Sequence, residues 1–336
     1  MTVPFAVNGF GRIGRALVRV AHRRPELGLV PVAVNDLAPA ATLARLLARD
    51  TVHGPFAAEL AADGEALIVA GRRVAVGSAA EPGECRWEES GARVVVEASG
   101  RFLAREAAAG HLGGCVERVV LSANSDDADV TLCLGVNDGD YDPAHHRVVS
   151  NASCTTNCVA PLARVLDDGW GLARGAMTTV HPYTVNQRLL DGPHAEVRRM
   201  RAAAANVIPI ATSAPSALGR VLPHLAGKLA GVSVRVPTPA AAMMELVAEL
   251  AADADPADLA AAFRAAAVDG PLAAVLAVSD EELVSSDYVG HPASAVVDLP
   301  LTTVVDRRLA RVVAWYDNEW GYANRLAELV SRLGTA

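Results

Sequence analysis

The chain has 336 residues, of which 51% are hydrophobic and 20% charged, and its formal net charge is −8. This length allows two domains with large cores, and the acidic balance argues against nucleic acid or an anionic membrane as a partner. No apolar run reaches the roughly 18–20 residues of a membrane span, and "MTVPFAVNGFGR" lacks a signal-peptide pattern, so we expect a soluble, cytoplasmic protein. The five scattered cysteines make a poor disulfide framework.

The first half of the chain has the pattern of an α/β domain. A β-like run at residues 3–7 precedes "NGFGRIG" and a helical stretch to about residue 23, and a second apolar run at 29–34 ends at Asn35 and Asp36. Further strand candidates, several of them separated by helix-like segments, are "EALIVA", "RRVAV", "ARVVVEA", "ERVVLS", "VTLCLGV" and "RVVS". Strands that alternate with helices predict a doubly wound parallel sheet of the Rossmann type.

From about residue 172 the pattern changes to strands separated by loops and two helices. The strand candidates there are "GAMTTV", "AGVSVRV", "MMELVAEL", "PLAAVLAV", "SAVVDL" and "RLARVVAWY", and "NRLAELVSRL" follows as an amphipathic helix. This spacing predicts an α+β domain with a mixed, largely antiparallel sheet. The domain boundary falls near residue 150, where one strand runs into a helix.

Three glycines follow the first strand in the pattern G-x-G-x-x-G: Gly9, Gly11 and Gly14. Without side chains the backbone can turn tightly and approach a pyrophosphate at the helix N-terminus. Asp36 ends the second strand, where a carboxylate can bind the ribose hydroxyls and repel a 2′-phosphate, which favours NAD over NADP. A tight turn alone would also explain the glycines; strand, glycines, helix, strand and acid in this order favour a dinucleotide.

Two cysteines stand four residues apart in "SNASCTTNC", where a strand gives way to a helix. Cys154 is placed at the helix N-terminus, where exposed N–H groups and the helix dipole stabilise a thiolate. A metal site would need further ligands with suitable spacing, which we do not find, and a redox pair would more naturally be C-x-x-C. Cys158, flanked by apolar residues, fits a small buried cysteine. His181 ends "GAMTTV" and is the candidate base, although a histidine there can also be a polar loop residue.

Together these segments resemble phosphorylating glyceraldehyde-3-phosphate dehydrogenases along essentially the whole chain. The matching stretches, in family order, are "NGFGRIGR", "AVNDL", "DTVHG", "SGRF", "SNASCTTNC", "TTVHPYT", "GKLAGVSVRVPTP" and "WYDNEWGYANR". The resemblance implies an NAD-binding Rossmann domain at 1–152, completed by a C-terminal helix at 319–336, and a catalytic domain at 153–318. It also implies a homotetramer.

The resemblance further implies oxidation of D-glyceraldehyde 3-phosphate with NAD and inorganic phosphate. Cys154 would form a thiohemiacetal and then a thioester, with His181 as the base. Phosphate-binding residues would be Ser153, Thr155, Thr184, Arg199, Thr212, Ser213 and Arg235. Cofactor contacts would be Gly9, Gly11, Arg12, Ile13, Gly14, Asp36, Ser122 and Asn318.

The stretch "VIPIATSAPSA" departs from the family pattern. Ser213 stands where glycine is usual, Pro215 where alanine is and Ser216 where lysine is. One hypothesis is therefore an isozyme that tolerates an electrophilic inhibitor of the catalytic cysteine. An erythrose-4-phosphate dehydrogenase and a non-catalytic family member are the alternatives; intact Thr184 and Thr212 favour the triose, and Cys154 and His181 argue for catalysis.

Overall fold

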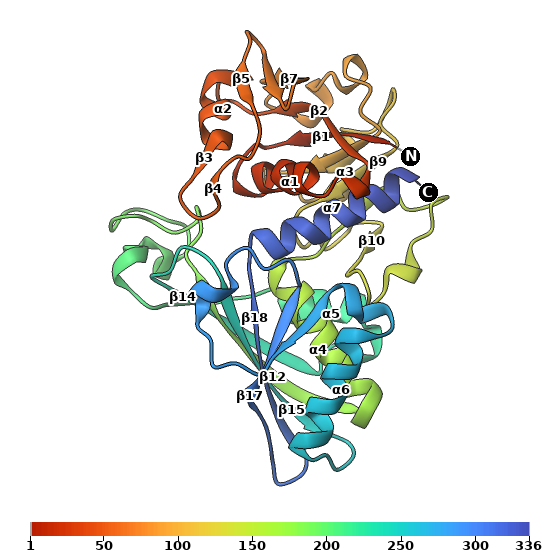
Figure 1. Cartoon of the computed structure of the whole chain (residues 1–336), viewed down its shortest axis with the longest axis vertical. Helices are drawn as coiled ribbons and strands as arrows, with labels where there is room; N and C mark the ends of the chain where they lie inside the picture. Colours follow the sequence, from red (N-terminus) through yellow and green to blue (C-terminus); the bar gives the residue numbers. More distant parts are fainter. Residues whose placement is uncertain (1, 336) are drawn as a thin grey trace. The chain divides into compact units, whose positions relative to one another are not determined.

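The structure is a computed structural model that describes residues 2–335, and it divides into two compact units (Figure 1). The first unit contains the chain up to residue 132, residues 139–152 and the segment from residue 323 onward. The second contains residues 133–138 and 153–322. The chain therefore contributes three separate segments to the first unit.

The first unit is built on a nine-stranded sheet in the order β10-β11-β9-β8-β1-β2-β7-β6-β5. Its strands are β1 (Val3–Asn8), β2 (Leu29–Asn35), β5 (Leu60–Ala62), β6 (Ala66–Val69), β7 (Arg72–Gly77), β8 (Val94–Glu97), β9 (Arg118–Leu121), β10 (Val130–Thr131) and β11 (Val148–Ser150). Neighbouring strands from β10 to β7 run parallel, and β6 and β5 add an antiparallel edge. A separate pair, β3 (Arg49–Asp50) and β4 (Gly54–Pro55), is antiparallel.

Strand β1 lies between β2 and β8, so the direction of winding reverses beside it. In such open α/β sheets ligands bind beyond the carboxyl ends of the strands at this point. The three strands end at Asn8, Asn35 and Glu97, and this edge of the sheet is where a cofactor site is expected.

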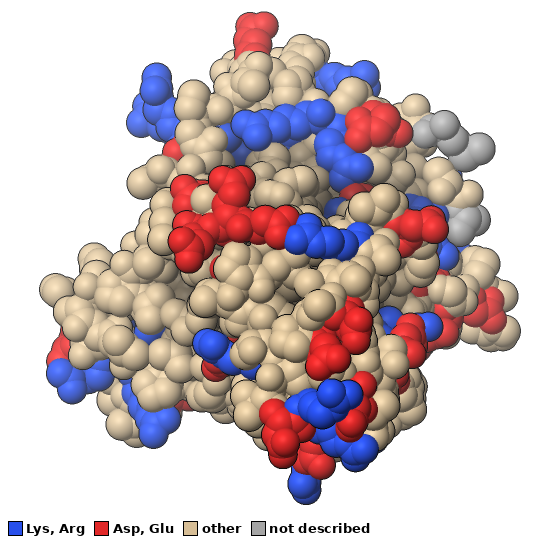
Figure 2. Space-filling model, turned by 60° about the horizontal axis from the view of Figure 1, so that its bottom comes forward, with Lys and Arg blue, Asp and Glu red and all other residues tan. Residues whose placement is uncertain are grey.

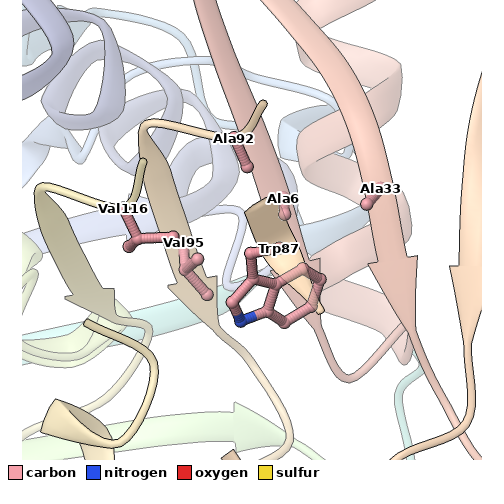
Figure 3. Close-up of a cluster of buried hydrophobic side chains, with 6 residues drawn as sticks. All are labelled: Ala6, Ala33, Trp87, Ala92, Val95 and Val116. Carbon is pink, nitrogen blue, oxygen red and sulfur yellow. The ribbon is translucent and has the colours of Figure 1, made fainter. Parts of the chain in front are cut away.

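The helices of the first unit are α1 (Arg12–Arg23), α2 (Ala40–Ala48), α3 (Arg105–Ala109) and most of α7 (Trp320–Thr335). The end of α1 and α7 are joined by Arg24, whose Nη1 donates to Glu328 Oε1 at 2.5 Å. Under the sheet, Trp87 packs against Ala6 of β1, Ala33 of β2 and Val95 of β8 (Figure 3). Alanine at these strand positions leaves room for the indole.

The second unit is built on a seven-stranded sheet in the order β13-β14-β12-β15-β18-β17-β16. Its strands are β12 (Leu172–Pro182), β13 (Ile208–Ala211), β14 (Leu229–Val236), β15 (Ala242–Leu250), β16 (Leu276–Ser279), β17 (Ala295–Val305) and β18 (Leu309–Tyr316). Only β12–β14 and β16–β17 are parallel pairs. Helices α4 (Cys154–Trp170), α5 (Ala214–Val221) and α6 (Pro256–Val268) cover one face of this sheet (Figure 1).

The fold class expected from the sequence is confirmed: a parallel nucleotide-binding type of sheet and a mixed second sheet. One strand was read too long, because β10 ends at Thr131 and the rest of "VTLCLGV" is a turn. There the side chain of Asn137 accepts a hydrogen bond from Cys133 N at 2.8 Å, and Gly135 has φ 81°. Strand β13 was missed.

Of the helices in residues 2–335, none has the length and apolar character required to cross a bilayer. On the face drawn in Figure 2, acidic and basic side chains lie next to one another. Among the ion pairs of the second unit, Asp253 accepts hydrogen bonds from Arg307 at 3.0 Å and Arg308 at 2.8 Å.

Candidate active site

Cys154 is the first residue of helix α4. Ser153 is its N-cap, and the Ser153 hydroxyl accepts a hydrogen bond from the backbone N–H of Thr156 at 3.1 Å, which fixes the first turn. Ala152, two residues before the cysteine, has φ 53°, a left-handed conformation that costs a non-glycine residue about 1 kcal/mol. The sharp turn thus separates the end of β11 from a well-capped helix start.

His181 lies near the end of β12 and is almost fully buried. Its Nε2 is 3.6 Å from Cys154 Sγ, and its Nδ1 is 2.8 Å from the carbonyl oxygen of Pro182. Nδ1 faces both this carbonyl, which only accepts, and Arg235 Nη1, which only donates. In the tautomer with the proton on Nδ1, which the carbonyl favours, the Nε2 lone pair faces the sulfur. This is the arrangement of a base ready to take the thiol proton.

Parallel pairing of β12 with β14 places Arg235 opposite His181. Arg235 Nη1 is 3.0 Å from His181 Nδ1 and donates to the Pro182 carbonyl at 3.1 Å, while its buried Nε has no hydrogen-bond partner among residues 2–335. Burial first, and the Arg235 charge second, lower the pKa of His181 to about 3. The imidazole is therefore neutral throughout the neutral range, but a pKa this low also makes it a weak base.

Burial raises the pKa of the Cys154 thiol, and the positive charge of Arg235 only partly offsets this. Hydrogen bonds from the backbone N–H groups of Cys154 and Thr155 act in the opposite direction and lower this pKa, as expected at a helix N-terminus. Desolvation is the largest of these effects on the Cys154 pKa. A raised thiol pKa and a lowered imidazole pKa both favour a neutral thiol beside a neutral imidazole.

Tyr316, at the end of β18, is the residue of this site that sequence reasoning missed. Its hydroxyl is 3.0 Å from Thr155 Oγ1 and 2.7 Å from Thr179 Oγ1, and its ring meets His181 edge-on at 6.1 Å between centroids. It lies in "WYDNEWGY", and a buried tyrosine at a strand end was a usable signal because its hydroxyl must find a partner.

The residues expected to bind phosphate all lie in the second unit. Thr155 and Ser153 belong to the start of α4, Arg235 contacts His181, and the charge of Arg199 contributes to lowering the pKa of Arg235, after burial. The Thr184 hydroxyl donates to Gln187 Oε1 at 3.0 Å.

Thr212 and Ser213 precede α5. The Thr212 hydroxyl accepts a hydrogen bond from Ala214 N at 3.2 Å, and Ser213 is the N-cap residue. The buried guanidinium of Arg235 beside His181 provides positive charge for an anion. Arg199 itself pairs with Glu196 at 2.8 Å.

In the first unit, a cavity of about 250 Å³ opens at the carboxyl ends of β1, β2 and β8. Its lining includes Gly9, Gly11 and Asp36. Gly9 has φ 91°, and a Cβ there would lie 2.5 Å from the backbone of Ser99, so only glycine fits. A Cβ on Gly14 would lie 2.5 Å from the Gly9 carbonyl oxygen, whereas Gly11 faces open space.

Helix α1 begins at this cavity, and its N-cap residue Gly11 has no side chain to cap it. The Asp36 carboxylate accepts hydrogen bonds from Phe10 N at 2.8 Å and Ala38 N at 3.0 Å, which fixes its position at the rim. An uncapped helix start and a fixed carboxylate on one cavity suit the pyrophosphate and a ribose of a dinucleotide.

The other cofactor candidates are not all gathered there. Ile13 and Arg12 are in the first turn of α1, and Arg12 donates two hydrogen bonds to Asp50 at 2.9 and 3.2 Å. Ser122 follows β9 and does not line the cavity. Asn318 belongs to the second unit, and its buried Oδ1 has no hydrogen-bond partner in the described chain.

Comparison with known proteins identifies both halves of the chain. Residues 3–105 match the family profile "Glyceraldehyde 3-phosphate dehydrogenase, NAD binding domain", and residues 153–318 match "Glyceraldehyde 3-phosphate dehydrogenase, C-terminal domain". The chain is 51% identical over 328 residues to glyceraldehyde-3-phosphate dehydrogenase of Kitasatospora aureofaciens, with 98% of each chain covered. It is 47% identical over 335 residues to that of Geobacillus stearothermophilus, covering 100% of this chain and 99% of the relative. The chain therefore belongs to the glyceraldehyde-3-phosphate dehydrogenase family and is an NAD-dependent oxidoreductase.

Proposed function

We propose that this protein oxidises D-glyceraldehyde 3-phosphate with NAD and inorganic phosphate to 1,3-bisphosphoglycerate. The observation that carries the proposal is the 3.6 Å approach of His181 Nε2 to Cys154 Sγ at the start of α4, beside Arg235. A nucleophile, a neutral base and a cation close together suit covalent chemistry on an anionic aldehyde.

In the first step His181 takes the proton of Cys154, and the sulfur attacks the aldehyde carbon to give a thiohemiacetal. The Cys154 backbone N–H at the N-terminus of α4 is available to the new oxyanion, and the imidazolium can donate to the same oxygen. The imidazolium gives its proton to this oxyanion, and the neutral His181 takes the proton back from the hydroxyl as the thiohemiacetal loses a hydride and becomes a thioester. Phosphate then attacks the thioester carbon and releases the Cys154 thiolate, which recovers its proton from His181.

NAD fits the residues of the first unit, so we propose that Gly9, Gly11 and Asp36 hold it, with Arg12, Ile13, Gly14 and Ser122 as further contacts. When bound, NAD supplies the hydride acceptor of the oxidation. From the second unit, the unpartnered Oδ1 of Asn318 is an acceptor suited to a carboxamide N–H group. We accordingly assign residues 1–152 with 319–336 to the NAD-binding domain and residues 153–318 to the catalytic domain.

The same site has to bind two phosphates, that of the substrate and the attacking one. We propose Ser153, Thr155, Thr212, Ser213 and Arg235 for the attacking phosphate, and Thr184, Arg199 and Arg235 for the substrate. The arginines and hydroxyls of this group are the donors that phosphate oxygens prefer.

The test is the initial rate of NADH formation from the aldehyde with and without inorganic phosphate, beside a Cys154→Ser variant. We expect a rate that requires both phosphate and the cysteine. No NADH from the wild-type enzyme would contradict the proposal, and a rate indifferent to phosphate would mean another acyl acceptor. Comparing kcat/KM for erythrose 4-phosphate separates the related activity; we expect the triose to be preferred because Thr184 and Thr212 are in place.

We also propose that the altered 213–216 segment reduces inactivation by electrophiles that target Cys154. Ser213 occupies the N-cap position of α5 at the proposed phosphate site, and the Ser216 hydroxyl donates to the Ser213 carbonyl at 3.0 Å, which holds the turn. A Ser213→Gly variant should then be inactivated faster than the wild type by a bulky epoxide. Equal rates would refute a role for Ser213.

Self-association is part of the proposal. Between residues 183 and 207 five large apolar side chains are mostly exposed, from 65% to 90%: Val185, Leu189, Leu190, Val197 and Val207. Such a concentration is typical of an interface. We propose a homotetramer, which sedimentation equilibrium would detect as about 139 kDa from chains of 34.8 kDa. We further propose a cytoplasmic location, where the catalytic cysteine stays reduced.

A further inference from the structure

A buried carboxylate of the first unit has no part in the chemistry proposed above. Glu97, at the end of β8, is completely buried. One oxygen accepts hydrogen bonds from Asn8 Nδ2 at 2.6 Å and His111 Nε2 at 3.1 Å. The other accepts from the backbone N–H and the hydroxyl of Ser99, at 2.8 and 2.5 Å.

One indole fixes the direction of both hydrogen bonds that His111 makes. Trp87 Nε1 is 3.1 Å from His111 Nδ1, and an indole nitrogen can only donate. Nδ1 is therefore the acceptor, the histidine proton is on Nε2, and it points to Glu97. Figure 3 shows the Trp87 ring packed beneath β1 and β2, which fixes its own orientation.

Glu97 is thus an anion whose donors are all neutral. Burial alone would raise its pKa, but hydrogen bonds from His111, Ser99 and Asn8 lower it. An uncompensated charge in the interior is costly and is kept only where its hydrogen bonds are complete. Packing of the core alone does not require a buried carboxylate, so the position of Glu97 at the carboxyl edge of the sheet points to another role.

The hydrogen bonds lead from Glu97 to the cavity. Asn8 Oδ1 accepts from Asn35 Nδ2 at 2.8 Å, and the Asn35 side chain both donates to the Ala79 carbonyl at 2.9 Å and accepts from Ala79 N at 2.8 Å. Asn8, Asn35, Ala79 and Ser99 all line the 250 Å³ cavity, whereas Glu97 and His111 do not. The anion therefore ties together the ends of β1, β2 and β8 and the loop after β7.

We propose that Glu97 is a positioning residue for the dinucleotide: without touching it, the carboxylate holds Asn8, Asn35 and Ser99 in the one arrangement that shapes the cofactor cavity. This inference rests on the proposed use of that cavity for NAD. Ser99 matters most directly, because its backbone packs against Gly9 of the cavity so closely that a Cβ on Gly9 would collide with it.

A Glu97→Gln substitution tests this with almost no change in shape. Either orientation of the new amide turns its two N–H groups toward donors: toward Ser99, or toward Asn8 and His111. If Asn8 flips to adapt, Asn35 has to flip as well, and the Ala79 N–H loses its acceptor. The disturbance therefore reaches the cavity in either case.

We expect Glu97→Gln to raise the dissociation constant and the KM for NAD roughly 10- to 100-fold, the effect of leaving one buried polar group unpaired. The kcat at saturating NAD should stay within about twofold, since the second unit is unchanged. Glu117→Gln is the matched control, because Glu117 is half exposed on the same unit, pairs with Arg93 and does not line the cavity.

Two substitutions of His111 keep the test decisive if Glu97→Gln fails to fold. His111→Leu removes a donor from Glu97 and should weaken NAD binding, whereas His111→Gln can donate to Glu97 and accept from Trp87 and should restore much of it. The ¹⁵N indole resonance of Trp87, identified by its loss in Trp87→Phe, should move in Glu97→Gln and not in Glu117→Gln.

Variants that lose stability but bind NAD as the wild type does would overturn the positioning role and reduce Glu97 to a structural residue. Equal NAD affinity of the Leu and Gln variants at position 111 would do the same. A wild-type protein that binds no NAD in calorimetry would instead refute the proposed function itself.

Discussion

The guanidinium of Arg235 controls where the proton of the Cys154–His181 pair resides. Arg235 Nη1 lies 3.0 Å from His181 Nδ1. A unit charge about 4 Å from another is worth roughly 4 kcal/mol at an effective dielectric constant near 20, or about 3 pKa units as an upper bound. Water admitted by a substitution screens part of this, so for Arg235→Met we expect shifts of roughly 1–2 units.

Both shifts go upward. The arginine charge disfavours an imidazolium, so its removal raises the pKa of His181 from about 3. The same charge favours a thiolate, so its removal raises the pKa of Cys154 further. A neutral alkylating agent such as iodoacetamide measures this without involving phosphate binding: the pH midpoint for modification of Cys154, located by peptide mapping, should move to higher pH.

The matched control is Arg198→Met, because Arg198 is exposed and donates to the Pro209 carbonyl away from the pair. We expect its alkylation profile to coincide with that of the wild type. A midpoint that stays in place in Arg235→Met, or moves to lower pH, would mean that the α4 dipole and not Arg235 governs the thiolate. In that case Arg235 does not set the protonation states of Cys154 and His181.

Three further substitutions test the packing of the two units. Tyr316→Phe leaves two buried threonine hydroxyls without their shared partner, so urea unfolding should show a loss of about 1–3 kcal/mol; a change below about 0.5 kcal/mol would contradict those hydrogen bonds. Gly9→Ala places a Cβ 2.5 Å from the Ser99 backbone, and calorimetry should show NAD affinity reduced by more than about tenfold, unless the backbone yields without cost. Ala70→Asn suits the positive φ of 51° in the two-residue turn with Gly71, so thermal unfolding should show a gain of about 0.5 kcal/mol, and a lower midpoint would refute the turn assignment.

Sequence patterns predicted the two sheets because alternation and apolar runs are local signals. They also predicted the glycine turn, since Gly9 and Gly14 are needed within a few residues of the strand they follow. They failed at "VTLCLGV", where a single side chain, Asn137, ends the strand by taking a backbone N–H. Competition between a side chain and a neighbouring strand for a backbone N–H leaves no local sequence pattern.

The sequence predicted which residues belong to the candidate site more completely than it predicted their distances and protonation states. Cys154 and His181 were identified from residue type and position, but the distance between them follows from the packing of α4 on β12. The contact of His181 with Arg235 follows from the β12–β14 register. Their protonation states depend on burial, which the sequence does not show. Tyr316 and the Glu97 cluster were missed for the same reason: each gains its meaning from partners 14 to 161 residues away.

The first unit cannot finish folding when its own first 152 residues have been made. Ser331 in α7 donates to the Leu27 carbonyl across 304 positions, and Arg93 donates to the Gly334 carbonyl across 241. During synthesis, β1 and α1 therefore lack their contacts with α7 until the whole of the second unit has been translated. Chaperones would meet a first unit that still lacks α7, and a circular permutant beginning near residue 320 would shorten that interval.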